Sequence, residues 1–162
     1  MTASPTIVPA TPCVGICSSG IGDSVCRGCM RFAHEVSRWN AYSGGERCLV
    51  LERLDTFLAR VLANRVELFD AELLAAALDA RRIPRDPARD PHRWLYDLLR
   101  AHANRVGVPA ACGFRVLAPG DAQDLAGLCR AVERDWHALS VAHYERYVEP
   151  GLQLVSTWLV ST

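Results

Sequence analysis

Four cysteines near the N-terminus are the residues whose type and spacing point most directly to chemistry. They follow the pattern Cys13-x3-Cys17-x8-Cys26-x2-Cys29 and lie within seventeen residues. Thiolate sulfur is a soft ligand, and four thiolates around one ion or cluster are typical of zinc and iron–sulfur sites. Several glycines in this stretch allow tight turns, so the chain can fold back and bring the two pairs together. The sequence therefore predicts one four-sulfur metal site.

The spacing leaves the choice between zinc and an iron–sulfur cluster open. Zinc ribbons usually present two C-x2-C pairs, whereas the first pair here is separated by three residues. The bacterial ferredoxin pattern C-x2-C-x2-C-x3-C does not match either. The alternatives to a metal site are a reversible disulfide and cysteines that share no role.

The remaining candidate ligands form no comparable pattern. They are Cys48, Cys112, Cys129, His34, Glu133 and His137. Cys129 lies on an apolar helical stripe and is predicted to be a buried thiol. Glu133 and His137 share a helix face, but a site there would need partners from another helix. The chain contains no phosphate-binding loop, nucleophile elbow or metalloprotease helix, so no enzymatic function is predicted.

The cysteine segment resembles a known family. The stretch PCVGICSSGIGDSVCRGCMRFAHEVSRWNAYSGGER is similar to the small bacterial proteins of domain-of-unknown-function family 1289, over about residues 12–54. Besides the four cysteines, the matched residues are Pro12, Gly15, Gly28, Arg31, Glu35, Trp39, Ser43, Glu46 and Arg47. The family's loop between the middle cysteines is usually more acidic than residues 18–23 here. Because the family is catalogued as predicted iron–sulfur proteins, the resemblance implies an iron–sulfur cluster on the four cysteines.

The other matched residues are expected to have structural roles. Arg31 and Glu35 are four positions apart and should form a weak ion pair on the first helix. Trp39 should cover the metal loop. Four arginines could instead form a basic rim that binds nucleic acid: Arg27, Arg31, Arg38 and Arg47. Acidic residues lie between them, which favours a mixed, solvated surface, so nucleic acid is not an expected partner.

Composition and charge set the cellular context. The 162 residues include 18 basic and 18 acidic side chains, a balance that gives no overall attraction to nucleic acid or to a membrane surface. Residues 1–11 lack the features of a signal peptide, and no stretch approaches the roughly 18 apolar residues of a membrane span. We therefore expect a cytoplasmic protein. Disulfides are rare in that compartment, which favours metal ligation for clustered cysteines.

Apolar periodicity predicts a mostly α fold. Helices are expected from Met30 onward, over Glu46–Leu62, over Asp70–Arg82, from Pro91 to about Val106, and from about Asp121 to Val148. Ser43 and Glu46 form a capping box, and Asp90 before Pro91 is a helix N-cap. Pro150 is expected to end the last helix. A short extended segment is expected at Gly113–Leu117, and the apolar tail Leu152–Val160 fits either helix or strand.

These elements suggest three regions. Residues 1–11 form a flexible leader, residues 12–63 a four-cysteine metal-binding loop with a helix pair, and residues 64–162 a helical, bundle-like body of unknown role. Alternatively, the helix ending at Leu62 joins both parts into one core. The predicted function is non-enzymatic metal binding with a structural, redox or sensing role, and an unidentified protein partner is possible. The alternative is a structural zinc site in a module that binds protein or nucleic acid.

Overall fold

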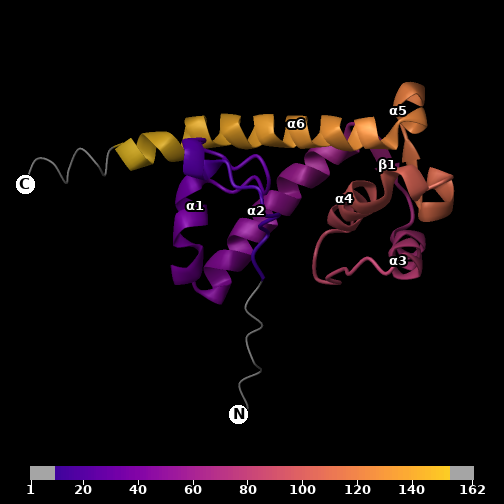
Figure 1. The fold of residues 1–162 in the computed structure, drawn as a ribbon, viewed down its shortest axis with the longest axis horizontal. Coiled ribbons are helices and arrows are strands. Elements are labelled where there is room, and N and C mark those ends of the chain that lie inside the picture. The colour runs from indigo at the N-terminus through magenta and orange to yellow at the C-terminus, as the bar shows by residue number, and fades with distance from the viewer. Residues whose placement is uncertain (1–9, 154–162) are drawn as a thin grey trace, which may run out of the picture. The chain divides into compact units, whose positions relative to one another are not determined.

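The computed structural model describes residues 10–153 and is mostly α-helical over this range (Figure 1), which confirms the predicted fold class. Its helices and strands are α1 (Ala33–Arg38), α2 (Gly44–Ala63), β1 (Val66–Leu68), α3 (Ala71–Ala80), α4 (Pro91–His102), β2 (Phe114–Val116), α5 (Pro119–Gln123) and α6 (Leu125–His143). The first nine residues of the predicted leader, and the predicted tail from residue 154 onward, lie outside the described residues.

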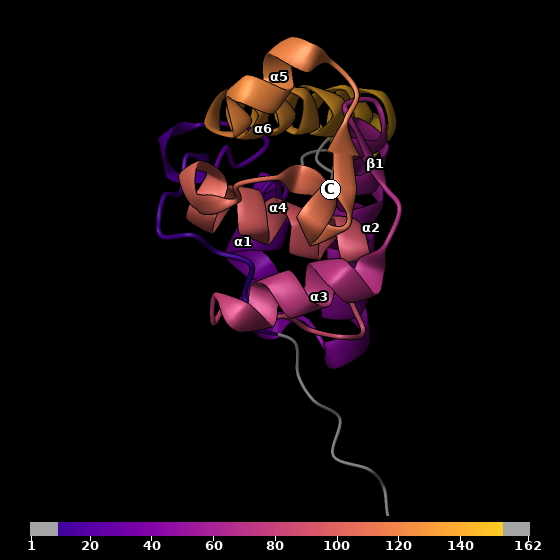
Figure 2. The same cartoon turned by 90° about the vertical axis from the view of Figure 1, so that its right-hand side faces the viewer.

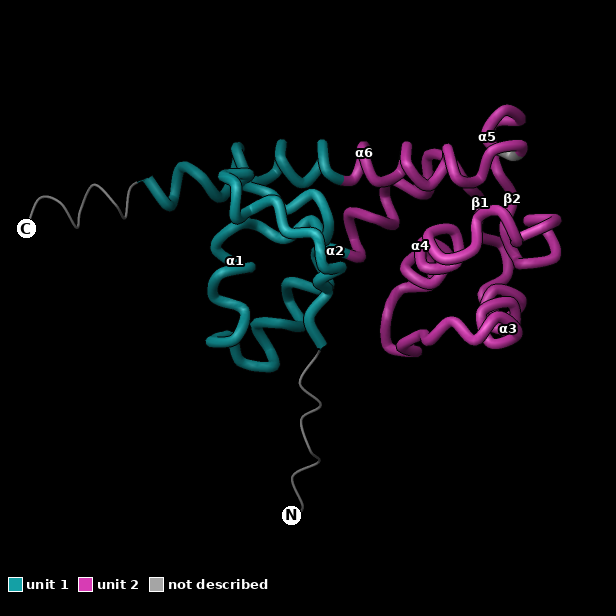
Figure 3. The backbone as a smooth tube through the Cα atoms, in the orientation of Figure 1, with its two compact units in different colours: residues 1–54, 137–162 teal, residues 55–136 magenta. Residues whose placement is uncertain are grey.

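The described chain divides into two compact units (Figure 3). Unit 1 is built from residues 10–54 and 137–153, and unit 2 from residues 55–136. The boundaries fall inside α2 and α6, so each of these helices contributes to both units. The predicted regions differ from this division, because residues 55–63 belong with the helical body and residues 137–153 with the cysteine segment. Helix α2 places the fully buried Leu54 in unit 1 and the fully buried Leu58 and Leu62 in unit 2. Independent folding of either part stays a prediction.

Local capping signals shape the helices of unit 1. The backbone N–H of Phe32 donates to the Glu35 carboxylate at 2.8 Å, which caps the start of α1. The predicted capping box before α2 is present: the backbone N–H of Ser43 donates to Glu46 at 2.8 Å, and the N–H of Glu46 donates back to the Ser43 hydroxyl at 3.3 Å. Helix α2 therefore begins at its predicted capping box. Helix α1 begins at Ala33 rather than at Met30, because Met30 has a left-handed backbone with a φ of +60°.

Unit 2 uses the same kind of signal. The Asp70 carboxylate accepts from the first-turn N–H groups of α3, and Asp90 accepts from the N–H of His92, with Pro91 at the first position of α4. Both predicted helix starts are confirmed. Helix α3 packs against α4, and the turn before β2 contacts α3 (Figure 2).

A two-stranded antiparallel sheet joins distant parts of unit 2. Strand β2 confirms the predicted extended segment, and its unpredicted partner β1 pairs with it in the register Val66↔Val116 to Leu68↔Phe114. Gly113 makes this pairing possible, since it has a φ of +81° and a Cβ there would lie 2.0 Å from the Asp70 carbonyl oxygen. The Gly113 carbonyl in turn accepts the N–H groups of Phe69 and Asp70, both at 3.0 Å.

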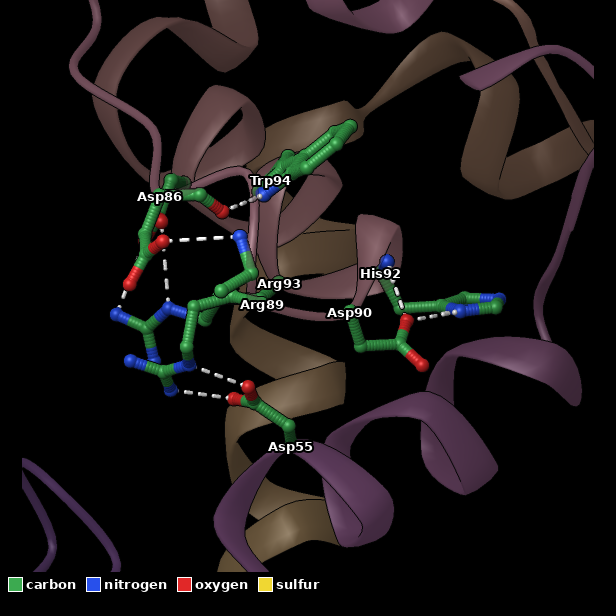
Figure 4. Close-up of polar contacts among 9 residues, drawn as sticks. Asp55, Asp86, Arg89, Asp90, His92, Arg93 and Trp94 are labelled. Atoms are coloured by element: carbon green, nitrogen blue, oxygen red, sulfur yellow. Dashed lines mark hydrogen bonds and ion pairs between the residues drawn. The ribbon is translucent and has the colours of Figure 1, made fainter. Parts of the chain in front are cut away.

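A buried ion pair fastens the proline-rich connector of unit 2 to α2 (Figure 4). The Arg89 guanidinium binds both carboxylate oxygens of Asp55 at 2.5 Å, and the side chain of Asp55 is 8% exposed. Nearby, the indole N–H of Trp94 donates to the Asp86 carbonyl at 2.9 Å. Together these contacts give a segment without helix or strand a defined path.

Three further predicted helix boundaries are wrong. Helix α4 ends at His102 rather than near Val106, and a 3₁₀ turn follows it. The predicted long helix begins at Leu125, because the Asp124 carboxylate caps it by accepting the N–H of Gly127 at 2.7 Å. Pro150 does not end the helix: a π-helical turn at Tyr144–Val148 precedes it, and residues 149–153 are helical. The wider turn accommodates a residue that cannot donate a backbone hydrogen bond.

Trp136 provides a test of the unit 2 core. Its side chain is 1% exposed and meets the Tyr96 ring edge-on at 5.5 Å. Replacing Trp136 by alanine should lower the free energy of unfolding by about 3–5 kcal/mol, because a large cavity remains in a packed core. Urea unfolding measures the loss, with Leu117→Ala as the control at a side chain that is half exposed. Equal stability of the two variants would contradict this core assignment.

Candidate metal centre

A tight turn of unit 1 carries the second cysteine pair. The N–H of Cys26 donates to the Arg31 carbonyl at 2.8 Å, and the N–H of Met30 donates to the Cys26 carbonyl at 2.8 Å. Met30 adopts a left-handed backbone with a φ of +60°, which closes the turn. Both sulfur-bearing residues, Cys26 and Cys29, are buried in this turn.

The turn favours a negatively charged sulfur at Cys26. Burial alone raises the pKa of the Cys26 thiol, but the backbone amides of Cys29, Ser18 and Gly28 and the Cys29 side chain together lower this pKa to about 7. Burial raises the pKa of Cys29, and the hydrogen bond and charge of Arg31 oppose that increase. Amide groups directed at a cysteine sulfur stabilise its thiolate form, which is the form that binds metal.

The first cysteine pair lies in an exposed loop. The Cys13 sulfur accepts the N–H of Gly15 at 3.5 Å, and the Cys17 sulfur lies 3.0 Å from the Ser19 hydroxyl. Gly15 adopts a φ of +87°, so the chain reverses direction between the two cysteines. Both sulfurs are therefore on the outside of unit 1, near polar neighbours.

The two cysteine loops touch each other at Gly28. A Cβ at this position would lie 2.4 Å from the Ile16 carbonyl oxygen, so only glycine fits. The Cys26 thiol donates to the same carbonyl at 3.7 Å. Beside this contact, the N–H of Arg27 donates to the Ser18 hydroxyl at 2.9 Å. The segment that links Cys13 to Cys17 is therefore held directly against the Cys26–Cys29 turn.

The structure brings Cys26 and Cys29 together but does not gather all four sulfurs. Among residues 10–153, no three His, Cys, Asp or Glu side chains are close enough to hold a metal ion. Convergence of the four sulfurs on one point therefore stays a prediction. The donor set still fits such a centre, because all four thiols are free and their two loops are in contact at Gly28. Closing it would require Cys13 and Cys17, which are exposed, to turn inward.

A cationic and aromatic layer lies behind the second pair. The Nε of Arg31 donates to the Cys29 sulfur at 3.3 Å, and its guanidinium carbon lies 4.7 Å from the centre of the Trp39 ring. Arg47 also lies over Trp39, at 5.5 Å. Trp39 thus contacts the cysteine turn through Arg31.

The predicted ion pair between Arg31 and Glu35 does not form. Arg31 precedes α1, whereas Glu35 lies within it and binds Arg53 at 2.5 Å. The Arg53 guanidinium also lies 3.7 Å from the centre of the Phe32 ring. The sequence analysis did not predict that Arg53 binds Glu35. The position of this charged residue next to Leu54, in the apolar stripe of α2, could have indicated a buried partner.

Three arginines of the possible basic rim, which the interleaved acidic residues disfavour, have partners within unit 1. Arg31 is buried, and Arg27 pairs with Asp23 at 2.9 Å. Arg47 donates to the backbone carbonyls of Trp39 and Asn40, at 3.1 and 3.3 Å. These arginines are thus engaged within unit 1 rather than presented together.

The other candidate ligands are dispersed in the described chain. Glu133 accepts the Tyr96 hydroxyl at 2.9 Å, whereas the Nε2 of His137 lies 3.2 Å from the Val25 carbonyl oxygen. These two side chains therefore contact different partners, although they share a helix face. His34 packs beside the Phe32 ring and joins no group of ligands.

Comparison with known proteins supports the resemblance of the cysteine segment. Residues 11–58 match the model of a family described as protein of unknown function (DUF1289). The predicted resemblance is confirmed for this segment. No curated protein and no solved structure matches the chain. Among the described residues, every helix is too short or too polar to cross a membrane.

Two cysteines outside the four-cysteine motif should differ in reactivity. Burial and the nearby Glu133 carboxylate raise the pKa of Cys129 to about 12, whereas Cys48 is exposed on α2. We expect iodoacetamide at pH 8 to alkylate Cys48 and leave Cys129 unmodified in the folded protein, as read by peptide mass spectrometry. The pKa of Cys129 is higher in the folded protein than in the unfolded chain, so ionisation of this thiol favours unfolding. The free energy of unfolding should therefore fall as pH rises from 9 toward 12. Rapid alkylation of Cys129 under native conditions would contradict its burial.

Proposed function

We propose that the DUF1289 segment binds one metal centre through Cys13, Cys17, Cys26 and Cys29, and that the protein is a non-enzymatic metal-binding protein. The observation that carries this proposal is the packing at Gly28, where the loop of the first cysteine pair lies against the turn of the second. Two loops that contact each other through a glycine, each with two free thiols, form a four-sulfur donor set within one small unit.

The donors and the family resemblance both bear on the proposed type of centre. Four thiolates suit both zinc and an iron–sulfur cluster, and the resemblance favours the cluster. A bound cluster would supply one-electron redox chemistry, whereas zinc would supply structural cross-linking. The chain's own residues hold the sulfurs: the backbone amides around Cys26 stabilise its thiolate, and Gly28 keeps the loops in contact.

The first cysteine pair is exposed, whereas Cys26 and Cys29 are buried. The proposal includes a structural role and a redox or sensing role, and the access of solvent to the bound centre distinguishes them. A cytoplasmic location fits this proposal, since thiols stay reduced there. A structural zinc site in an interaction module is the second candidate, and elemental analysis distinguishes the two.

Gly28→Ala tests the proposal. The new methyl group would collide with the Ile16 carbonyl, separate the two loops and greatly reduce bound metal. Gly20→Ala is the matched control, because a Cβ at Gly20 meets no heavy atom within 4 Å. Both variants are purified without oxygen alongside the wild type, and metal and sulfide per chain are measured.

The outcomes of this comparison are distinct. The proposal expects metal in the wild type and in Gly20→Ala, and a clear loss in Gly28→Ala. A wild-type protein without metal, or a Gly28→Ala variant that retains its full metal content, would refute it. Circular dichroism on each variant shows that the helices remain folded.

A further inference from the structure

Arg31 is a buried cation at the edge of the proposed metal centre. Arg31 is 3% exposed, and its Nε donates to the Cys29 sulfur at 3.3 Å. The guanidinium also lies over the Trp39 ring at 4.7 Å. A guanidinium carries its charge at every relevant pH, so this charge is taken out of water when the unit folds.

No carboxylate of the described residues balances the charge of Arg31. Within residues 10–153 Arg31 forms no ion pair, and the nearest acidic residue along the chain, Glu35, binds Arg53 at 2.5 Å. Its side-chain hydrogen bond in the described chain goes to the sulfur of Cys29. A buried cation is costly unless an anion compensates it, and a neutral thiol is only a weak acceptor.

A four-cysteine centre supplies the missing negative charge. Four thiolates around a divalent ion carry a net charge of about −2, and a four-cysteine cluster is likewise anionic. We infer that Arg31 is the counter-cation of the metal–thiolate centre and that it sets the affinity of the centre through the Cys29 sulfur. This inference rests on the proposed function. Arg31 acts on a ligand rather than on the metal, so it is a positioning and charge-balancing residue.

The adjacent Arg47 provides an internal comparison. It lies over the same Trp39 ring, but its donors go to the backbone carbonyls of Trp39 and Asn40 rather than to sulfur. Removing its charge should therefore leave the metal centre nearly unchanged. The two arginines thus separate the effect of contact with sulfur from that of stacking on the tryptophan.

The test uses the full chain and three variants: Arg31→Met, Arg31→Lys and Arg47→Met. Affinity for zinc is measured by chelator competition. Arg31→Met should weaken binding by about 10–100-fold, Arg31→Lys should recover most of the loss, and Arg47→Met should stay within a few-fold of wild type. Where the purified protein holds a cluster, Arg31→Met should also lower its reduction potential, because a nearby cation favours the more negative reduced state.

Thermal unfolding with and without metal separates charge balance from packing. With metal, Arg31→Met should be less stable than wild type. Without metal it should be at least as stable, because an uncompensated buried charge has been removed. A variant that is equally destabilised in both states, or that does not fold in either, would assign Arg31 a packing role and overturn the inference. Unchanged metal affinity in Arg31→Met would overturn it too, while leaving the proposed function intact. A wild-type protein that binds no metal would refute both the inference about Arg31 and the proposed function.

Discussion

The close approach of Gly28 to the Ile16 carbonyl is the constraint on which the candidate centre depends. It positions the exposed first cysteine loop against the buried second one, and it also brings the Cys26 thiol to the same carbonyl. Any side chain at position 28 would force the loops apart. A contact between two backbones therefore positions the two cysteine loops against each other.

Most of the helices could be predicted because their signals are local. Ser43 with Glu46, Asp70, and Asp90 with Pro91 each act within one helical turn, and each begins a helix as expected. The pairing of β1 with β2 could not be predicted, since the two strands lie far apart in the sequence and each is only three residues long. The prediction that Pro150 ends the last helix was wrong for a related reason. The π-helical turn that accommodates this proline cannot be recognised from residue types.

The same distinction applies to the candidate centre. The spacing of the cysteines indicated a candidate donor set, and the glycines between them indicated a fold-back. The partner of Glu35 could not be derived from spacing, because Arg53 lies eighteen positions away and competes successfully with Arg31. Releasing Arg31 from that expected pair leaves its charge facing Cys29. A pairing rule based on one helix thus fails where α2 supplies a better-placed cation.

The proposed function requires both cysteine pairs to bind one centre. X-ray absorption at the K edge of the metal found in anaerobically purified, full-length protein tests this requirement, because the first coordination shell reports the ligand atoms. We expect a shell made of sulfur alone at about 2.3 Å. A shell containing nitrogen or oxygen in place of one cysteine pair, or protein that holds no metal, would contradict it.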